Sequence, residues 1–204
     1  MILYIFITHK KNINCRTRII QMMREKKSTN FIIVVGDTKT YYDPKTKLLR
    51  ISCNDNYEGL PEKIIKTYNF VHNSSIFLEY THFCKLDDDM IINKLIDINL
   101  IKEKNYYGNV LRTLNGDRKW HIGKCSTTSK FNNCEYNGIY VPWCGGGFGY
   151  ILSRYSLSFI INDNTYKDEI YEDLYIAKIL STNNIKPEQW NEIKKYILSP
   201  EHSI

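Results

Sequence analysis

The chain has 204 residues, enough for one sizeable domain, and we expect a single domain over residues 1–204. Hydrophobic residues make up 43% and charged residues 25% of the chain, a balance that excludes wholesale disorder, collagen and coiled coil. The 28 Lys and Arg exceed the 22 Asp and Glu, so the net charge of +6 favours anionic partners such as nucleic acid, phosphates or membrane surfaces.

The chain begins with a short apolar run, Ile2–Ile7, which predicts a buried strand. This run is far shorter than the roughly 20 residues that a membrane-spanning helix needs. It also lacks the basic region and the cleavage site of a signal peptide. We therefore expect a cytoplasmic or otherwise soluble protein with no integral membrane segment. Similar runs predict strands over residues 31–35, 48–52, 81–86 and 106–111.

Helical patterns separate several of these strands. Residues 16–27 place Ile19, Ile20 and Met23 on one face, and residues 61–72 open with Pro61 at a plausible first helical position. Further helices are predicted from Ser153 or Arg154 and over residues 171–180. Strands that alternate with helices predict an α/β domain with a largely parallel sheet. Residues 112–141 lack a clear periodicity and predict long loops with a hairpin.

Six cysteines are spread irregularly along the chain. Their spacing does not fit a small disulfide scaffold, and no CxxC pair indicates a zinc site. Free thiols are therefore expected, although Cys125 and Cys134 could close a loop in an oxidising environment.

Three consecutive acids, Asp87, Asp88 and Asp89, follow the predicted strand over residues 81–86. One interpretation is a solvated turn in which one Asp caps a helix that starts at Asn93. The other is a site for Mg²⁺ or Mn²⁺, because carboxylates suit these cations and the cations bridge phosphate oxygens. Ligands of open α/β sheets bind beyond the carboxyl ends of the strands, so the position of the acids favours the second interpretation.

A glycine-rich segment, Gly145-Gly146-Gly147-Phe148-Gly149, removes side chains where the backbone turns tightly or a ligand approaches closely. It is neither a Walker loop nor a GxGxxG motif that opens a helix, and a plain loop into a strand is the alternative.

Paired acids, Glu172 and Asp173, stand at the start of the last predicted helix. They are either first-turn residues that favour the helix dipole or, beside a metal site, candidates for a general base. His202, near the chain end, is either an exposed terminal residue or a ligand.

Taken in order, these motifs resemble glycosyltransferase family 31, particularly its Fringe and core 1 β1,3-galactosyltransferase branches. The resemblance runs from about Ile2 to His202. The motifs that carry it are Asp55-x-Tyr57 with Leu60 and Lys63, the Lys85-Leu86-Asp87-Asp88-Asp89 element, Lys119-Trp120, the segment 145–153, Glu172-Asp173-Leu174 and Pro200-Glu201-His202.

The resemblance implies a GT-A fold, which is a Rossmann-like, nucleotide-binding mixed sheet flanked by helices, and a GT-A-like catalytic domain over residues 1–204. It implies inverting, β1,3-type transfer of a hexose from a UDP-sugar to a hydroxyl of a glycan or glycoprotein acceptor, with Mn²⁺ or Mg²⁺ as cofactor. By analogy, Asp173 is the catalytic base, Asp89 and His202 bind the metal, and Asp87 contacts the donor. Members of the family are usually Golgi-anchored.

The remaining expected contacts divide between the two substrates. Donor contacts are expected from Asp88, Arg16 and Lys63. Contacts to the acceptor or to a sugar are expected from Trp120, Trp143, Gly145, Gly146, Gly147 and Glu172. The alternative for both tryptophans is a place in the core, since Trp is usually buried.

Two other functions stay open: a catalytically inactive relative that binds a sugar nucleotide or glycan, and a basic nucleic-acid-binding domain. Nucleic acid is not the expected partner, because no helix or strand carries a Lys/Arg stripe with interleaved aromatic residues.

Overall fold

The computed structural model describes residues 1–112 and 117–199. Its centre is an eight-stranded mixed sheet in the order β11-β7-β10-β5-β1-β2-β4-β3, flanked by helices, which confirms the predicted α/β class and the GT-A type of architecture. The strands of this sheet are β1 (Ile2–Ile7), β2 (Phe31–Asp37), β3 (Tyr41–Asp43), β4 (Leu48–Ser52), β5 (His82–Asp87), β7 (Tyr106–Gly108), β10 (Tyr150–Ser153) and β11 (Glu188–Gln189). The α-helices of the described residues are α1 (Cys15–Glu25), α2 (Leu60–Asn73), α3 (Arg154–Ile160), α4 (Glu172–Thr182) and α5 (Ile193–Tyr196).

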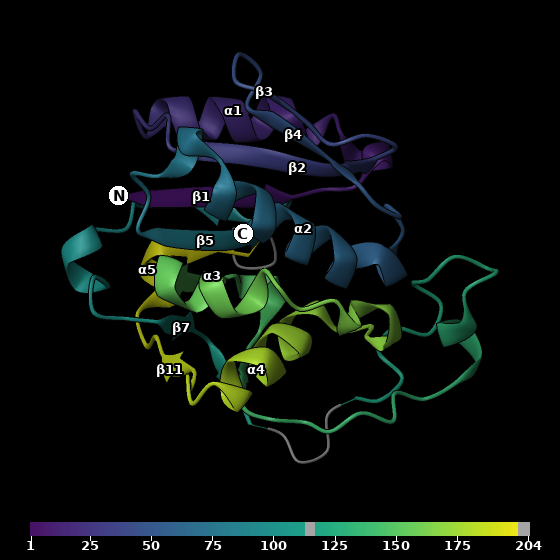
Figure 1. The fold of residues 1–204 in the computed structure, drawn as a ribbon. Coiled ribbons are helices and arrows are strands. Elements are labelled where there is room, and N and C mark those ends of the chain that lie inside the picture. The colour runs from purple at the N-terminus through teal and green to yellow at the C-terminus, as the bar shows by residue number, and fades with distance from the viewer. Residues whose placement is uncertain (113–116, 200–204) are drawn as a thin grey trace.

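The strands β5, β1, β2 and β4 are neighbours and run parallel, and β10 lies antiparallel to β5. Figure 1 shows β2, β1 and β5 side by side. Parallel strands end at the same edge of a sheet, and the register places Ile7 opposite Asp87 at that edge. Since Tyr150 pairs with Lys85, β10 begins at this edge as well. The segments that follow β1, β2, β4 and β5 and the one that precedes β10 therefore gather in one place.

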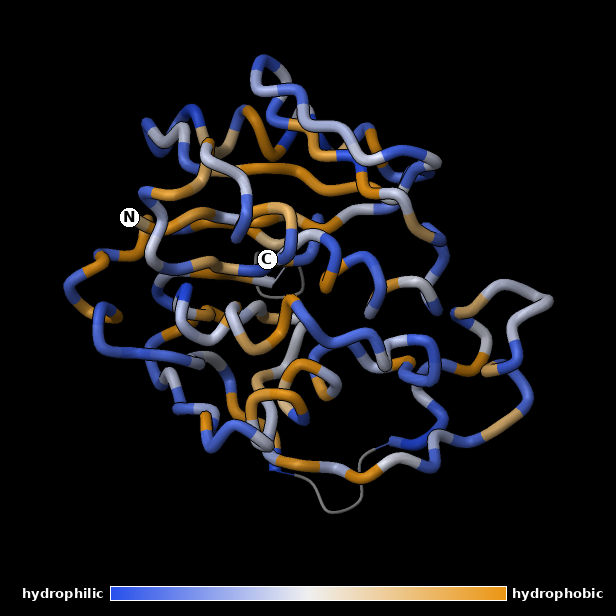
Figure 2. Tube along the Cα trace, viewed as in Figure 1, coloured by the Kyte–Doolittle hydropathy of each residue, from blue (hydrophilic) through white to orange (hydrophobic). Residues whose placement is uncertain are grey.

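The sheet is covered on both faces, which explains the continuous apolar run of β1. Alternate residues of β1 enter different cores: Leu3, Ile5 and Ile7 lie in the core that α2, α3 and α4 also line, whereas Tyr4 and Phe6 lie in the core of α1. Figure 1 shows α2, α3 and α4 grouped together and apart from α1. In Figure 2 the hydrophobic segments follow the central strands and the hydrophilic ones the outer loops.

The predicted strand over residues 106–111 is divided. Its first half is β7 of the central sheet, and its second half is β8 (Val110–Leu111), which pairs with β9 (Trp143–Cys144). The segment that joins β8 to β9 is the long loop, and this short ladder holds its two ends together. No strand occurs in residues 117–141, so the predicted internal hairpin is wrong for this stretch.

Side-chain hydrogen bonds organise that loop in place of a hairpin. His121 is fully buried, with Nε2 at 2.9 Å from the Phe131 carbonyl oxygen and 3.0 Å from that of Cys134. Its Nδ1 lies 2.8 Å from the Tyr171 hydroxyl. The backbone N–H of Ser126 donates to the Glu58 carboxylate (3.1 Å). This hydrogen bond connects the loop to the segment before α2.

The alternative in which an Asp caps a helix from Asn93 is wrong. Ile91 and Ile92 form β6 (Ile91–Ile92), which pairs with β12 (Ile197–Leu198), and the backbone N–H of Asn93 donates to the Tyr196 carbonyl oxygen (2.8 Å). The apolar side chains of this stretch, including Ile92 and Ile96, complete the core beside α1. Tertiary packing thus decides the conformation here.

All six cysteines are free thiols, as expected, and that includes Cys125 and Cys134. No helix of residues 1–112 and 117–199 is long and apolar enough to cross a membrane.

Gly149 is required by the backbone at the start of β10. It has a φ of +80°, and a Cβ built there would lie 2.4 Å from the Lys85 carbonyl oxygen. We expect Gly149→Ala to lower the free energy of unfolding by at least about 2 kcal/mol, because the strain and the clash add. Gly147→Ala is the matched control, since a Cβ there meets no atom within 4 Å. Denaturant unfolding of both variants checks this; equal stabilities would contradict it.

Candidate functional site

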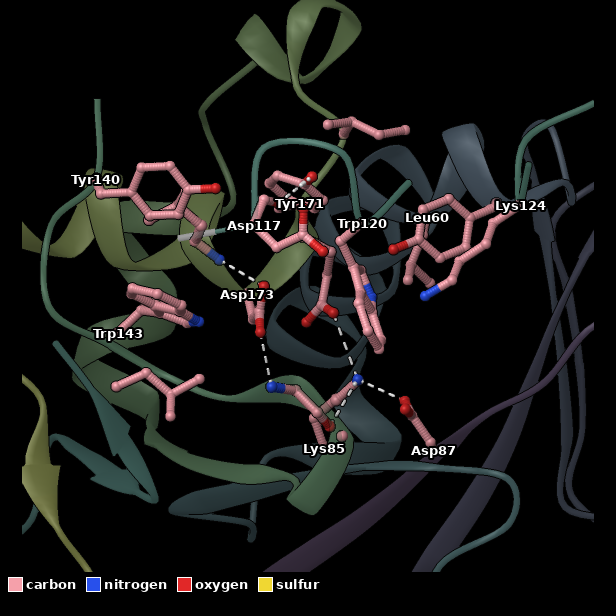
Figure 3. Close-up of a pocket in the computed structure, with 17 residues that line it drawn as sticks. Leu60, Lys85, Asp87, Asp117, Trp120, Lys124, Tyr140, Trp143, Tyr171 and Asp173 are labelled. Carbon is pink, nitrogen blue, oxygen red and sulfur yellow. Dashed lines mark hydrogen bonds and ion pairs between the residues drawn. The ribbon is translucent and has the colours of Figure 1, made fainter. Parts of the chain in front are cut away.

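Two clefts meet at the edge where the parallel strands end. The strand-end cleft, of about 560 Å³, is formed by residues after β1 and β5 and around the start of α2. The aromatic cleft, of about 550 Å³, lies between the glycine segment, α4 and the long loop (Figure 3). Tyr57, Leu60, Asp87 and Lys124 line both clefts, so the two are continuous. The strand-end cleft is also lined by Thr8, His9, Asp55, Lys63, Asp88 and Asp89, and the aromatic cleft by Trp120, Tyr140, Trp143, Gly146, Gly147, Glu172 and Asp173.

The three consecutive acids follow β5 and have different surroundings. The carboxylate of Asp87 lies 2.6 Å from the Lys85 ammonium. Asp88 turns toward β1 and α1 and accepts hydrogen bonds from the Thr8 hydroxyl and the Cys15 thiol. Asp89 is exposed, and partial desolvation followed by repulsion from Asp87 raises the pKa of Asp89. Asp87 therefore stands at the junction of the clefts and Asp89 in the strand-end cleft.

The Asp89 carboxylate could bind a divalent cation whose other ligands are oxygen atoms of a substrate. Its carboxylate forms no ion pair among the residues with described positions, and the charge of Asp87 adds to its need for a counter-ion. Within the same part of the chain, no group of three or more His, Cys, Asp and Glu could hold a metal alone. His202, the second predicted ligand, lies outside the described residues. One carboxylate with substrate phosphates is a usual environment for Mg²⁺.

Lys85 is a buried lysine that connects three elements of the site. Its side chain is 1% exposed, and its Nζ lies 3.3 Å from Glu172 Oε2 in addition to the contact with Asp87. Nζ also donates to the Gly146 carbonyl oxygen (3.3 Å). Burial opposes the charge, but the carboxylates of Asp87 and Glu172 hold the pKa of Lys85 above its usual value. A buried charge of this kind is stable only with its partners in place.

Glu172 and Asp173 open α4, where acids also favour the helix dipole, but their environments differ. Glu172 is enclosed, accepts a hydrogen bond from the Tyr150 hydroxyl (2.6 Å), and has a pKa that burial raises to about 7 against the charge of Lys85. Asp173 is half-buried and accepts hydrogen bonds from the backbone N–H groups of Gly146 and Leu174, both at 2.8 Å. Burial raises the pKa of Asp173, and these donors oppose the rise. Of the two, Asp173 is the more accessible carboxylate.

The predicted glycine contacts separate into two groups. Gly146 and Gly147 line the aromatic cleft, whereas Gly145 is not among its lining residues and lies against Leu111. A Cβ at Gly146 would lie 3.2 Å from both Lys85 Nζ and Glu172 Oε2. Gly146 therefore permits the close approach of β5, α4 and the glycine segment.

Both predicted tryptophans line the aromatic cleft, on either side of Asp173 (Figure 3). Trp143 is 8% exposed and packs on Tyr140, which fits the core alternative as well, whereas Trp120 is 59% exposed. The Lys124 ammonium lies 3.2 Å from the centroid of the Trp120 ring, which is a cation–π contact. One face of Trp120 is therefore occupied by a cation.

The two predicted basic donor contacts have different positions. Lys63 lines the strand-end cleft but is 3% exposed, pairs with Asp55 at 2.5 Å and donates to the Thr8 carbonyl oxygen (3.0 Å). Arg16 lines neither cleft. Instead Arg18, two positions further along α1, donates to the carbonyl oxygens of Asp88 and Met90. Arg18 is thus the arginine of α1 that contacts the segment after β5, and the donor contact expected of Arg16 stays a prediction.

Several residues of the site have no role that the sequence predicts. Asp117, Lys124 and Tyr140 come from the aperiodic loop, where no pattern predicts their position. Lys85 is different, because it stands within an apolar run that predicts a buried strand. A lysine is almost never fully buried unless it is paired, so its position in the sequence indicates a buried ion pair.

Comparisons with known proteins bear on the fold and the family. A structure of A197 from STIV matches with a TM-score of 0.50 and 14% identity over 93% of this chain and 81% of that one. A putative glucose-1-phosphate thymidylyltransferase from Bacillus anthracis, solved in complex with a sucrose, matches with a TM-score of 0.48 and 9% identity over 94% and 87% of the two chains. No curated protein sequence matches significantly. The family model described as Galactosyltransferase matches residues 19–191, most of the chain, and this protein therefore belongs to the galactosyltransferase family.

Proposed function

We propose that this protein is a metal-dependent, inverting hexosyltransferase that moves a sugar from a UDP-sugar to a hydroxyl of a glycan or glycoprotein acceptor. The observation that carries the proposal is the arrangement of carboxylates around one junction. Asp87 lines both clefts, Asp89 lines the strand-end cleft, and Asp173 lines the aromatic cleft. A donor and an acceptor in adjoining clefts would meet beside Asp87.

The strand-end cleft is the proposed donor site. It lies at the carboxyl ends of parallel strands, where α/β sheets bind nucleotides. A divalent cation at Asp89, Mn²⁺ or Mg²⁺, would stabilise the negative charge that develops on the UDP leaving group. Asp87, which lines this cleft, would accept hydrogen bonds from hydroxyls of the donor. The charge of Lys63 is already paired with Asp55, so its expected contribution is to hold the start of α2 beside the cleft.

The aromatic cleft is the proposed acceptor site. Trp120, Trp143 and Tyr140 provide flat apolar faces, which suit the C–H faces of a sugar ring. Asp173, between the two indole rings, would accept the proton of the acceptor hydroxyl. The acceptor oxygen then forms a bond to the anomeric carbon on the face opposite UDP. The bond from that carbon to the β-phosphate oxygen breaks, its electron pair leaves with UDP, and the configuration inverts.

The choice of UDP-sugar and the β1,3 linkage rest on the family resemblance. A UDP-release assay across a panel of UDP-sugars with Mn²⁺, with and without glycan acceptors, identifies the donor. UDP release that depends on an acceptor supports transfer. Binding of a UDP-sugar without any release would instead favour the inactive, sugar-nucleotide-binding alternative.

Ligand binding provides the first check. With Mn²⁺ and the UDP-sugar near 100 times its Kd, a gain of about 2.7 kcal/mol should raise the melting temperature by about 5 to 10 °C. Asp89→Asn should abolish the Mn²⁺-dependent part of this shift. Asp168→Asn, whose side chain is 87% exposed and pairs only with Lys130 in the described residues, should retain it. An unchanged shift in Asp89→Asn would contradict the metal assignment.

Removal of the base provides the second check. Asp173→Asn should lower the rate of transfer by about 1,000-fold or more, since the amide cannot accept the acceptor proton. The affinity for UDP with Mn²⁺ should stay within about twofold. Asp117→Asn, the matched change of another carboxylate in the aromatic cleft, should keep the rate within about tenfold. Loss of transfer in Asp117→Asn but not in Asp173→Asn would reassign the base.

A further inference from the structure

Lys85 has contacts that reach from the donor side of the junction to the proposed base. Its ammonium lies 2.6 Å from Asp87 on β5 and 3.3 Å from the carbonyl oxygen of Gly146. The N–H of the same Gly146 residue donates to Asp173 Oδ2 at 2.8 Å. Figure 3 shows the dashed contacts that converge on the Lys85 ammonium and, beside them, the one between Asp173 and the glycine segment. A short chain of polar contacts therefore runs from Asp87 to Asp173.

The surroundings of Lys85 leave this chain little freedom. Glu172 Oε2 lies 3.3 Å from the ammonium, and its other oxygen accepts from Tyr150, whose hydroxyl also accepts from that of Tyr68 (3.0 Å). Lys85, Glu172, Tyr150 and Tyr68 are all at most 5% exposed. A Cβ at Gly146 would approach the ammonium to 3.2 Å. The ammonium is thus fixed against the glycine segment.

Lys85 also differs in charge from the other ionisable groups that interact with Asp173. Within the described residues, these other groups are Asp87 of β5, Glu172 of α4, Tyr57 before α2, Tyr106 of β7, Cys144 of β9 and Tyr140 of the long loop. None of them is a cation, whereas Lys85 carries a positive charge. It therefore favours the carboxylate form of Asp173, whereas Asp87 and Glu172 disfavour it.

We propose that Lys85 is a positioning residue for sugar transfer: it couples the donor contact Asp87 to the Gly146 residue, whose backbone N–H orients Asp173. This inference rests on the proposed function. A purely structural lysine would only neutralise Glu172 inside the core. A positioning lysine also sets the geometry and the charge of Asp173, and these two roles have different kinetic consequences.

The test compares Lys85→Met with the wild-type enzyme in kcat, in UDP–Mn²⁺ affinity and in the pH profile of kcat. Asp173 acts as a carboxylate, so activity rises with pH through its pKa. Loss of the nearby positive charge raises that pKa, and the acid limb should move upward by about one pH unit or more. We expect kcat at pH 7 to fall about 100-fold and the UDP–Mn²⁺ affinity to change less than about threefold.

If Lys85→Met alone fails to fold, the double variant Lys85→Met/Glu172→Gln tests the same proposal. It removes both charges of the buried pair, so it should melt near the wild-type temperature. Its kcat should still fall about 30-fold or more, since the link to Gly146 is lost. Wild-type kcat in this variant would overturn the proposal, because Lys85 would then serve only to neutralise Glu172.

Lys63→Met is the matched control, since Lys63 is also buried and paired with an Asp, but at the strand-end cleft. It should raise the KM for the UDP-sugar and leave the acid limb of kcat in place. An acid limb that moves equally in Lys63→Met and Lys85→Met would also overturn the proposal. Absence of transfer by the wild-type enzyme with every UDP-sugar would instead overturn the proposed function itself.

Discussion

Repulsion between carboxylates at one edge of the sheet is the constraint on which the site depends. Asp55 follows β4, Asp87 ends β5, and Glu172 and Asp173 open α4. These elements converge at the edge, where the like charges repel one another strongly in a partly buried environment. Two buried lysines compensate: Lys63 pairs with Asp55, and Lys85 lies between Asp87 and Glu172. A buried ion pair is stable only when both partners are present. The Lys85–Glu172 pair therefore also fixes α4 relative to β5, and the Lys63–Asp55 pair fixes α2 relative to the segment that follows β4.

Much of the fold follows from local patterns. The apolar run of β1 predicts a strand with the observed bounds, because both faces of the sheet are covered and every position is buried. The helices α1, α2 and α4 follow from apolar stripes such as Ile19 and Met23 of α1. The location of the site also follows, since the acids after β5 must lie at the carboxyl edge of a parallel sheet.

The remaining features depend on long-range contacts that no local pattern encodes. The stretch after Met90 has apolar residues that fit a helix, but pairing of β6 with β12 determines its conformation. The contacts of Arg18 with the carbonyl oxygens of Asp88 and Met90 depend on the rotation of α1 about its axis, which a periodicity fixes only to within a face. The partners of Lys85 come from β5, the glycine segment and α4, so only the tertiary structure identifies them.

The closed loop between β8 and β9 has a consequence for substitutions in the aromatic cleft. Its ends are joined by their own ladder, its interior is held by the hydrogen bonds of His121, and Ser126 ties it to Glu58. These contacts add to the packing of Tyr136 and Phe131 on the core that α2, α3 and α4 line. Trp120 is 59% exposed and Lys124 contacts its ring, so neither side chain belongs to that core. Substitutions of these two residues would therefore change one wall of the aromatic cleft and leave the strand pairing that positions Asp87 intact.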